Sequence, residues 1–468
     1  MGATTSSHDA RSVCDLLIVG GRILDLRAKS GVLDGAAIAI RDGVIVAVGD
    51  RVELEDAWMP ARRIDAAGRV IAPGFVEAHV HLAAYLGAGR PYQRSTGPGL
   101  FCGGGRVEVV LPMVARMCSM PVPAELVAAV VRPVLAAMLR AGITGVVDAG
   151  SCGIDGLVTA ATEVGIRAAI GPSLADLWHD EHGVLVRQAD PDVLLAEARD
   201  AIGRHDGAGG GRIRAVVSAV ETMACSDELL AGIAELTAQH AIPTHVHTHI
   251  SQATVAAHQA AFGRTPTQRL VDTGMLSPRC TAMHAGFLTD EDIVFAETGV
   301  TVNHNPIGNA MLGFGTTAGR SVPRLLAAGV PIVLGSDYAP DTVSTPFQTI
   351  RAALMLQRDL AASDDALTLE QALRMATQAG PGLGRSGQLG QVAAGQLADL
   401  LLVDTTGLHH LGSDHPVPAL ALHAHAGDVS TVIVDGRVVV EQGQLIDIDE
   451  AALATQAYHA LTTLASHT

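Results

Sequence analysis

Two histidines separated by one residue give the clearest chemical signal in the chain. His79 and His81 end the segment PGFVEAHVH, and the apolar residues before them predict a buried strand over 70–76. Residues at i and i+2 of an extended chain point to the same face, so both imidazoles can converge on one ion. Neutral imidazole is a favoured ligand for zinc and similar metals. We therefore expect a metal site where this strand ends.

A second histidine group lies in the segment THVHTHISQ, which spans 244–252. Its three histidines share one face by the same period of two. The outermost, His249, is best placed for the mouth of the predicted site. His245 and His247 would lie deeper, and we expect them to have a mainly structural role.

Three further polar residues stand where predicted strands end. They are His284, His304 and Asp337, and the last offers a carboxylate to a metal or a water. The run HDEH at 179–182 lacks the His-Glu-x-x-His spacing of zinc sites on helices. The histidines near the C-terminus are expected at the surface or in packing contacts: His409, His410, His423 and His425.

The middle of the chain alternates short apolar strands with helical stretches, which is typical of βα repeats. With 70–76 as the first, eight strands result, which predicts an α/β fold: a (β/α)8 TIM barrel with its site at the C-terminal ends of the strands. Helix starts are predicted at Ser226 and Thr368, each of which can cap a first turn. A Gly-rich loop at 85–105 lies where substrate would enter. The other strands are expected at 143–148, 166–170, 213–221, 243–250, 279–284, 300–304 and 331–336.

Both ends of the chain are rich in predicted strands joined by Asp-Gly turns. Neither end offers much sheet alone, so we expect the two to pair into one small, sandwich-like β-domain. The predicted organisation is a disordered tail at 1–13, a composite β-domain from 14–68 and 386–445, a metal-dependent barrel at 69–385 and a C-terminal helix at 446–468.

Composition limits the possible partners. The chain has 468 residues, 48% of them hydrophobic, which suits a folded enzyme with one large domain and a smaller one. A net charge of −17 argues against binding to nucleic acid or to anionic membrane surfaces. The six scattered cysteines form no Cys-x-x-Cys pair, so a reducing cytoplasm is the simplest location. We expect a small-molecule substrate and a homo-oligomer.

Five segments together resemble the amidohydrolase superfamily. In chain order they are PGFVEAHVH, HTHISQ, MHAGFLTDED, VTVNHNPIGNAMLGFG and PIVLGSD. The branch they resemble holds triazine hydrolases and cytosine- or adenosine-type deaminases, and the likeness covers nearly the whole chain. The segment NHNPIGNAMLGFG is also similar to the molinate and phenylurea hydrolase group.

The resemblance implies one divalent metal ion per chain, with zinc expected and cobalt, iron or manganese as substitutes. It also implies four ligands, which are His79, His81, His249 and Asp337. Asp337 would take a proton from the reacting water and pass it to the leaving group, while His284 polarises the electrophile. His304 is expected to contact the substrate.

One position departs from the branch. Its deaminases usually carry Glu three residues after the strand-five histidine, where it protonates the substrate ring. Here that position is Gln252, which can donate a hydrogen bond but cannot shuttle a proton. The substitution favours substrates whose carbonyl the metal can polarise, namely ureas, carbamates or thiocarbamates.

Two other functions remain open. One is an aminohydrolase of an N-heterocycle in which Asp337 and His284 do all the proton work. The other is a catalytically silent barrel, which the presence of all four expected ligands disfavours. Glu221 could bridge a second ion, although a substrate-contacting or salt-bridged role is the simpler expectation.

Overall fold

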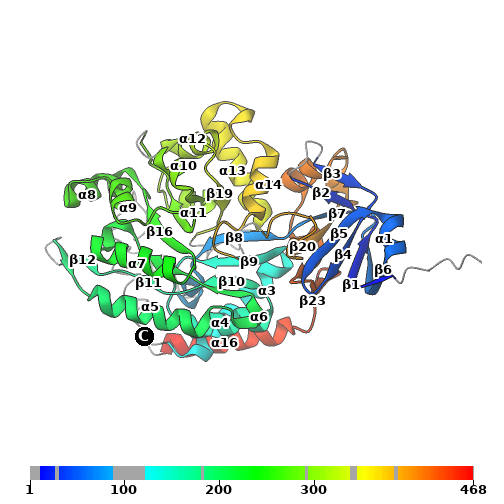
Figure 1. The fold of residues 1–468 in the computed structure, drawn as a ribbon, viewed down its shortest axis with the longest axis horizontal. Helices are drawn as coiled ribbons and strands as arrows, with labels where there is room; N and C mark the ends of the chain where they lie inside the picture. The colour runs from blue at the N-terminus through cyan, green and yellow to red at the C-terminus, as the bar shows by residue number, and fades with distance from the viewer. Residues whose placement is uncertain are drawn as a thin grey trace, which may run out of the picture.

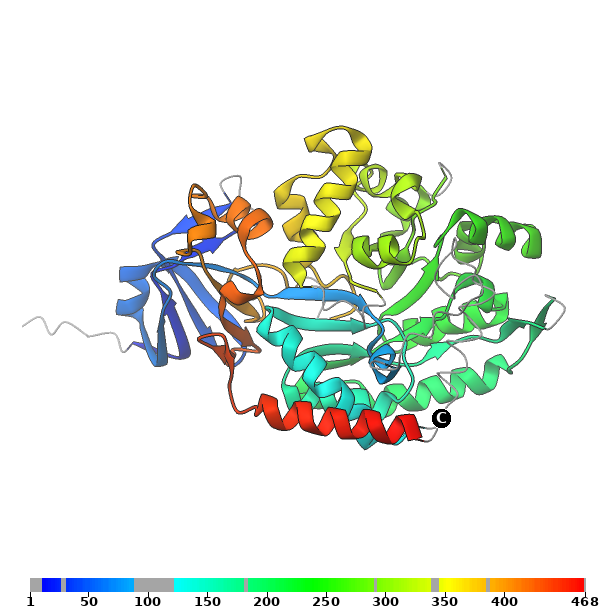
Figure 2. The ribbon, with the colours of Figure 1, turned by 180° about the vertical axis from the view of Figure 1, so that it is seen from behind.

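Parallel strands form the centre of the molecule, and every residue of β8 (Phe75–Val80) and β9 (Ile143–Asp148) is buried. The computed structural model describes residues 11–26, 31–87, 122–180, 184–289, 293–337, 345–383 and 388–466. Figures 1 and 2 show an α/β body with a β-rich part at one end, which brings the blue N-terminal strands beside the orange and brown C-terminal ones.

The central strands follow one another in chain order, as βα repeats require. Four strands form one sheet, in the order β14-β10-β9-β8, and six form another, in the order β11-β15-β16-β17-β18-β19. All pairings between them are parallel. The remaining bounds are β10 (Arg167–Ile170), β11 (Ser173–Leu174), β14 (Ile213–Ala215), β15 (Val217–Ala219), β16 (Thr244–Thr248), β17 (Cys280–His284), β18 (Thr301–His304) and β19 (Ile332–Leu334).

The α/β class is confirmed, but a continuously hydrogen-bonded barrel is not. The fourth predicted strand, 213–221, is broken into β14 and β15, which belong to different sheets, and the third, 166–170, is β10, after which the short β11 joins the other sheet. Between the last and first strands, pairing is reduced to an isolated bridge between Val80 and Asp337. The strand order is therefore that of a (β/α)8 barrel, with the ladder interrupted at these two places.

The predicted first strand, 70–76, is in fact two elements. β7 (Arg69–Pro73) pairs with β20 (Leu400–Asp404) in the terminal sheet, and β8 then begins the barrel order. Pro73 has no N–H to continue a ladder, and a Cβ on Gly74 would lie 2.1 Å from Oγ1 of Thr144. Pro-Gly therefore marks the point where the chain passes from one sheet to the other.

The terminal strands form two sheets. One contains only N-terminal strands, in the order β5-β4-β1-β6, and the other combines both ends of the chain, in the order β23-β22-β21-β20-β7-β2-β3. The domain bounds themselves stay a prediction. The strands are β1 (Ser12–Val19), β2 (Arg22–Leu24), β3 (Val32–Asp34), β4 (Ala36–Arg41), β5 (Val44–Asp50), β6 (Trp58–Asp65), β21 (Val429–Val434), β22 (Arg437–Glu441) and β23 (Gln444–Leu445). A separate hairpin joins β12 (Leu177–His179) and β13 (Leu185–Arg187).

Helices cover the outside of the parallel strands. Ser226 caps α7 and Thr368 caps α14, as predicted. α16 packs along α3 (Figure 2). Within the described residues, no helix has the length and apolar character needed to cross a bilayer. The helices are α1 (Arg51–Ala57), α3 (Ala124–Arg140), α4 (Ile154–Val164), α5 (Pro191–His205), α6 (Ala208–Gly211), α7 (Asp227–Gln239), α8 (Gln252–Phe262), α9 (Pro266–Asp272), α10 (Val294–Thr298), α11 (Pro306–Met311), α12 (Ser321–Ala327), α13 (Pro346–Ala361), α14 (Leu369–Thr377), α15 (Pro416–Pro418) and α16 (Glu450–Ser466).

A buried ion pair joins the parallel strands to the terminal sheet. Arg167 begins β10, and its Nε lies 2.8 Å from Oδ2 of Asp399, next to β20. Its Nη2 also donates to Asp435 at 2.7 Å. The side chains of Arg167 and Asp399 are only 4% and 2% exposed, so removing one partner leaves a charge in a site that water cannot solvate.

We expect Asp399→Ala to destabilise the protein by about 3 kcal/mol, because Arg167 would keep a buried charge with only part of its compensation. The matched control is Glu450→Gln, which removes the exposed ion pair to Arg140 and should cost less than about 1 kcal/mol. The measurement is the thermal unfolding midpoint of both variants beside the unsubstituted chain. Equal midpoints for the two variants would contradict a stabilising role for the buried pair.

Candidate metal and active site

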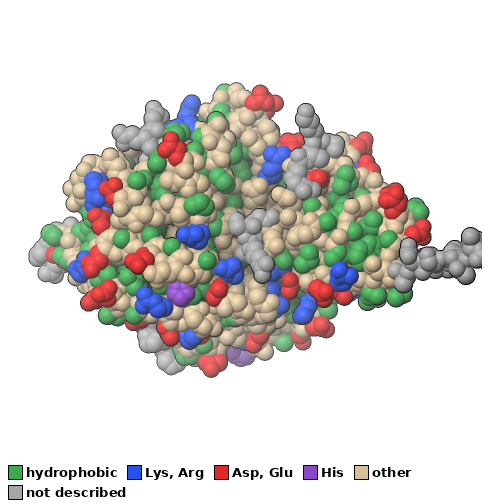
Figure 3. All heavy atoms as spheres, in the orientation of Figure 1, with side chains coloured by type: hydrophobic (Ala, Val, Ile, Leu, Met, Phe, Trp, Pro, Cys, Tyr) green, Lys and Arg blue, Asp and Glu red, His purple; other side chains and the backbone are tan. Residues whose placement is uncertain are grey.

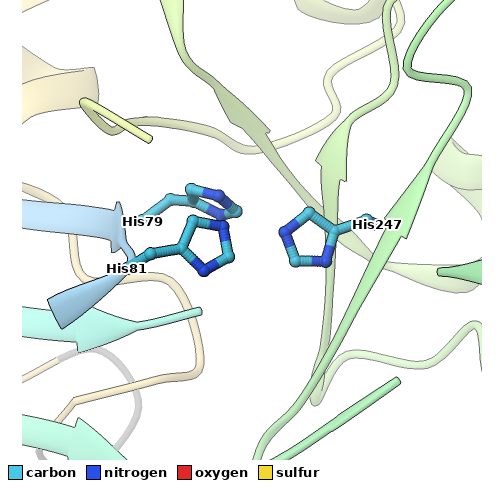
Figure 4. Close-up of side chains that lie close together, drawn as sticks. All are labelled: His79, His81 and His247. Carbon is cyan, nitrogen blue, oxygen red and sulfur yellow. The ribbon is translucent and has the colours of Figure 1, made fainter. Parts of the chain in front are cut away.

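Three histidines from opposite sides of the strand order converge at its C-terminal end. His79 and His81 come from the end of β8 and His247 from β16, and their rings face one another (Figure 4). One ring nitrogen from each lies within 4.8 Å of the others. The ring centroids of His79 and His247 are 5.0 Å apart, and those of His81 and His247 are 5.3 Å apart.

Asp337, from the residues that follow β19, lies beside two of these histidines and forms a second possible ligand group with His79 and His284. Its Oδ1 lies 3.2 Å from Nε2 of His79 and 3.5 Å from Nε2 of His81. Two ligand atoms on one tetrahedral zinc ion lie about 3.3 Å apart, because each is about 2.0–2.1 Å from the metal. The spacing of these donors therefore fits a bound cation.

The structure brings His247, and not the predicted His249, close to His79 and His81. β16 ends at Thr248, and the backbone of His249 is left-handed with φ +50°, so the period of two stops before this residue. The ring of His249 turns away from the cluster: its Nε2 lies 3.3 Å from Oγ1 of Thr267, and the ring packs edge-on to Phe295. His247, predicted to be structural, takes the position expected for His249.

For His79, His247 and Asp337, the protonation states that the fold favours are those a metal requires, whereas Asp337 and Asp148 raise the pKa of His81 against the effect of burial. Burial lowers the pKa of His79 to about 4 and holds that of His247 well below the usual range, so both imidazoles are neutral. Burial opposes ionisation of Asp337, but the imidazoles of His284, His79 and His81 outweigh it and hold the pKa of its carboxyl well below normal. A metal ligand must be a neutral imidazole or an ionised carboxylate.

Backbone conformation and small neighbours position two of these residues. His284 and Asp337 both have positive φ, +69° and +66°, which is strained for residues other than glycine and is common at functional sites. A Cβ on Gly308 would lie 2.5 Å from Cβ of Asp337, and one on Gly335 would lie 2.7 Å from Cβ of His79. Only glycine lets the chain pass this close to the cluster.

His284 is oriented by α11. Its Nδ1 lies 2.8 Å from Oδ1 of Asn309, an atom that can only accept, so the neutral ring carries its proton on Nδ1. This leaves the lone pair of Nε2 available. Burial lowers the pKa of His284, and the ring packs edge-on to Phe314. Asn309 lies inside the motif NHNPIGNAM, but spacing alone gave no reason to choose it.

Two buried carboxylates stand beside the cluster. Oε1 of Glu77 accepts from the N–H of Ser336 at 2.7 Å and from that of His79 at 3.3 Å, which links β8 to the segment after β19. Asp148 accepts from Ser151 at 2.7 Å, and its charge favours a protonated His81. The sequence did not predict either residue, because the position of an acidic residue in a strand does not show which other segment its carboxylate will contact.

The other predicted site residues differ in burial and in their distance from the cluster along the fold. His304 is buried at the end of β18, where burial, with a smaller contribution from His284, lowers its pKa to about 4. Glu221 is buried, and its carboxylate accepts from Oγ1 of Thr222 at 2.8 Å. Among the described residues, the groups able to hold an ion do not include Glu221. Gln252 is exposed as the first residue of α8. Most of the predicted entry loop, from 88 onwards, lies outside the described residues.

This combination of parallel α/β fold, imidazole cluster and strand-end carboxylate is that of a metal-dependent hydrolase. The sequence profile of the Amidohydrolase family matches residues 70–439. The chain belongs to the amidohydrolase family, as its motifs predicted, and is a hydrolase acting on carbon–nitrogen bonds.

Similar proteins span nearly the whole chain. It is 28% identical to a 5'-deoxyadenosine deaminase of Methanosarcina mazei, over 97% of this chain and 99% of that one. It is 29% identical to a 5-methylthioadenosine/S-adenosylhomocysteine deaminase of Syntrophobacter fumaroxidans, over 94% and 96%. The crystal structure of an adenosine deaminase from Xanthomonas campestris with bound zinc superposes with a TM-score of 0.84 at 27% identity, covering 98% and 100%. An atrazine chlorohydrolase from Arthrobacter aurescens, complexed with zinc, shares the fold with a TM-score of 0.83 at 24% identity, over 95% and 100%.

The corrected ligand set predicts different behaviour for two histidines that are separated by one residue. His247→Ala should lose nearly all tightly bound metal, because it removes one of three converging imidazoles. His249→Ala should keep about one ion per chain, because its ring points towards Thr267. Elemental analysis of both proteins, purified without chelator, checks this. Metal loss in His249→Ala with retention in His247→Ala would reverse the assignment.

Asn309→Asp tests the orientation of His284. The new carboxylate would face Nδ1 and raise the pKa of an imidazole that burial now holds below 6.5. If His284 works as the neutral ring, activity is lost as the pH falls through this pKa, so the acid limb of kcat/KM should move to higher pH. Asn309→Leu should instead lower kcat about 10- to 100-fold with metal content unchanged. An acid limb that stays in place would show that Asn309 does not act through His284.

Proposed function

We propose that the protein is an aminohydrolase that removes an exocyclic amine from an N-heterocycle, with adenosine-type purine nucleosides as the first class to test. One observation carries the proposal: the imidazole–carboxylate cluster occurs in a chain whose relatives, over nearly their full length, are named as deaminases. This reverses the preference drawn from Gln252 alone, which favoured ureas and carbamates.

The proposed cofactor is one divalent ion, with zinc favoured, held by His79, His81, His247 and Asp337. Three imidazoles and one carboxylate suit a borderline-soft cation, and two of the similar structures contain zinc. Oδ2 of Asp337 is buried without a hydrogen-bond partner among the described residues, which supports an additional partner at this position. A bound ion would supply Lewis acidity and lower the pKa of water towards neutrality.

Asp337 and His284 would carry the proton transfers. The carboxylate of Asp337 is ionised and can accept a proton from the attacking water and deliver it to the departing amine. His284, with its proton fixed on Nδ1 by Asn309, presents Nε2 to the reacting centre. His304, buried next to His284, would contact the substrate.

The chain handles the ring nitrogen of such a substrate without the usual glutamate. Counted from His247, the third residue is Ile250, which carries no proton, and Gln252 is exposed. This supports the form of deamination in which Asp337 and His284 do all the proton work. The same observation favours the alternative, hydrolysis of a urea, carbamate or thiocarbamate, because such carbonyls need no ring protonation.

A cavity beside the cluster has a suitable size. It measures about 790 Å³ and is lined by residues that include Ser151, Cys152, Leu174 and Trp178. Ser151 donates to Asp148, one of the groups that raise the pKa of His81, whereas none of the proposed ligands lines the cavity. Ligand cavities of about 300–1,000 Å³ are typical of small-molecule sites. We propose that it receives the part of the substrate that does not react.

The test is a steady-state screen of zinc-loaded protein on adenosine-type nucleosides, aminated heterocycles, phenylureas and carbamates. We expect ammonia release and the absorbance change of purine deamination, with activity abolished in Asp337→Asn. Cleavage of a urea or carbamate, with no ammonia from any aminated heterocycle, would contradict the proposal and establish the alternative. A cytoplasmic location and homo-oligomeric assembly remain predictions.

Gln252 provides a control on how the substrate ring is handled. Because Gln252 is exposed at the start of α8, we expect both Gln252→Ala and Gln252→Glu to change kcat/KM by less than about tenfold, the effect of one hydrogen bond. The measurement is ammonia release by both variants on the best substrate from the screen. A large gain in Gln252→Glu alone would show that position 252 reaches the substrate and can supply the missing proton shuttle.

A further inference from the structure

A second group of histidines gathers far along the chain, between β20 and β21. This segment holds several short helical turns, of which η6 (Leu408–His410) and η8 (Ala426–Asp428) carry the group. We call it the C-terminal histidine cluster and define it by its residues, His409, His410, His425 and Asp428. Apart from the barrel-mouth residues, three of these, His409, His425 and Asp428, are the described residues whose ligand atoms lie close enough together to hold an ion.

The cluster is built around one carboxylate oxygen. Oδ2 of Asp428 lies 2.9 Å from Nε2 of His409, 3.4 Å from Nε2 of His410 and 3.4 Å from Nδ1 of His425. It also accepts the backbone N–H of His425 at 2.9 Å. The rings of His409 and His425 stack with centroids 4.6 Å apart, so their edges lie side by side. One oxygen thus has more nitrogen neighbours than it has lone pairs.

His410 supplies an independent indication that the cluster binds a ligand. Its side chain is only 1% exposed, yet neither ring nitrogen makes a well-formed hydrogen bond with the described part of the chain. Buried polar atoms in proteins normally have a hydrogen-bond partner or bind a water or an ion.

We propose that the C-terminal histidine cluster is a second metal site, which binds a borderline-soft divalent cation such as Zn²⁺ through His409, His425 and Asp428 with His410 beside them. Imidazole and carboxylate are the ligands that such cations prefer. A cation among these groups would also relieve the crowding of nitrogens around Oδ2. The site shares no residue with the barrel-mouth cluster.

Exposure distinguishes the two sites. The side chains of His409 and His425 are 39% and 57% exposed, whereas His79 is fully buried. An exposed site competes with water and exchanges its ion freely, so it should bind more weakly than the buried cluster and lose its ion first to a mild chelator. It ties the turn at 408–410 to the turn at 426–428, and its occupancy should therefore affect stability and leave catalysis unchanged.

The experiment is equilibrium dialysis of the full-length, zinc-loaded protein against Zn²⁺, with zinc per chain measured by elemental analysis. We expect two ions per chain in the unsubstituted protein and one in His409→Ala/His425→Ala, with kcat/KM unchanged within about twofold. The matched control is His459→Ala, an exposed histidine of α16, which should keep both ions. His247→Ala should lose the buried ion and keep the exposed one.

Each outcome decides the proposal. Saturation at one ion in the unsubstituted chain, or two ions retained by the double variant, would overturn it. Loss of an ion in His459→Ala would show unspecific surface binding and overturn it equally. Because the double variant is assayed for zinc and not only for activity, failure of the proposed deamination leaves this test unaffected.

Discussion

The junction between the first and last strands of the parallel order is the contact on which the site depends. The N–H of Asp337 donates to the carbonyl of His79 at 2.8 Å, next to the isolated bridge between Val80 and Asp337. This hydrogen bond brings β8 to the residues that follow β19, although the two are more than 250 residues apart in sequence. It also sets Oδ1 of Asp337 against the imidazoles of His79 and His81, so one contact completes the strand order and assembles the site.

Small residues and strained backbone hold this junction in place. Gly335 and Gly308 approach the cluster so closely that a Cβ would collide with His79 or Asp337. The left-handed conformations of His284 and Asp337 turn their side chains inward just where each strand ends. Such conformations persist only where surrounding contacts impose them, and the hydrogen bonds of Glu77 to the backbone of Ser336 and His79 supply some of those contacts.

Much of this was accessible from the sequence, and the exceptions have a common cause. The convergence of His79 and His81 follows from local geometry, because both leave the same strand. The sequence predicted His249 rather than His247 at the site, because the alternation of side chains along a strand shows which residues share a face but not where the strand ends. The backbone turns left-handed at that residue, and the alternation ends with His247 inside. The break at Pro73-Gly74 was visible as a signal, but which sheet each side would join depends on Leu400–Asp404, a segment far along the chain.

Surface charge and buried charge have different roles in this chain. Arg side chains lie scattered among acidic ones on the face shown in Figure 3, which is an ordinary mixed surface. The acidic groups around the buried cluster differ in how readily they ionise. Burial raises the pKa of Glu77 to about 7 and raises that of Asp148, while Asp337 stays ionised.

A divalent cation among His79, His81, His247 and Asp337 would lower the raised pKa values of Glu77 and Asp148. Its charge would exceed that of Asp337 and favour the ionised forms of Glu77 and Asp148, which already accept hydrogen bonds from backbone N–H groups. These two carboxylates would then be the outer neighbours of the cation, since their hydrogen bonds stabilise a charge that burial alone opposes. The hydrogen bonds that hold β8 to its neighbouring strands would thus also suit a positive ion at the proposed site.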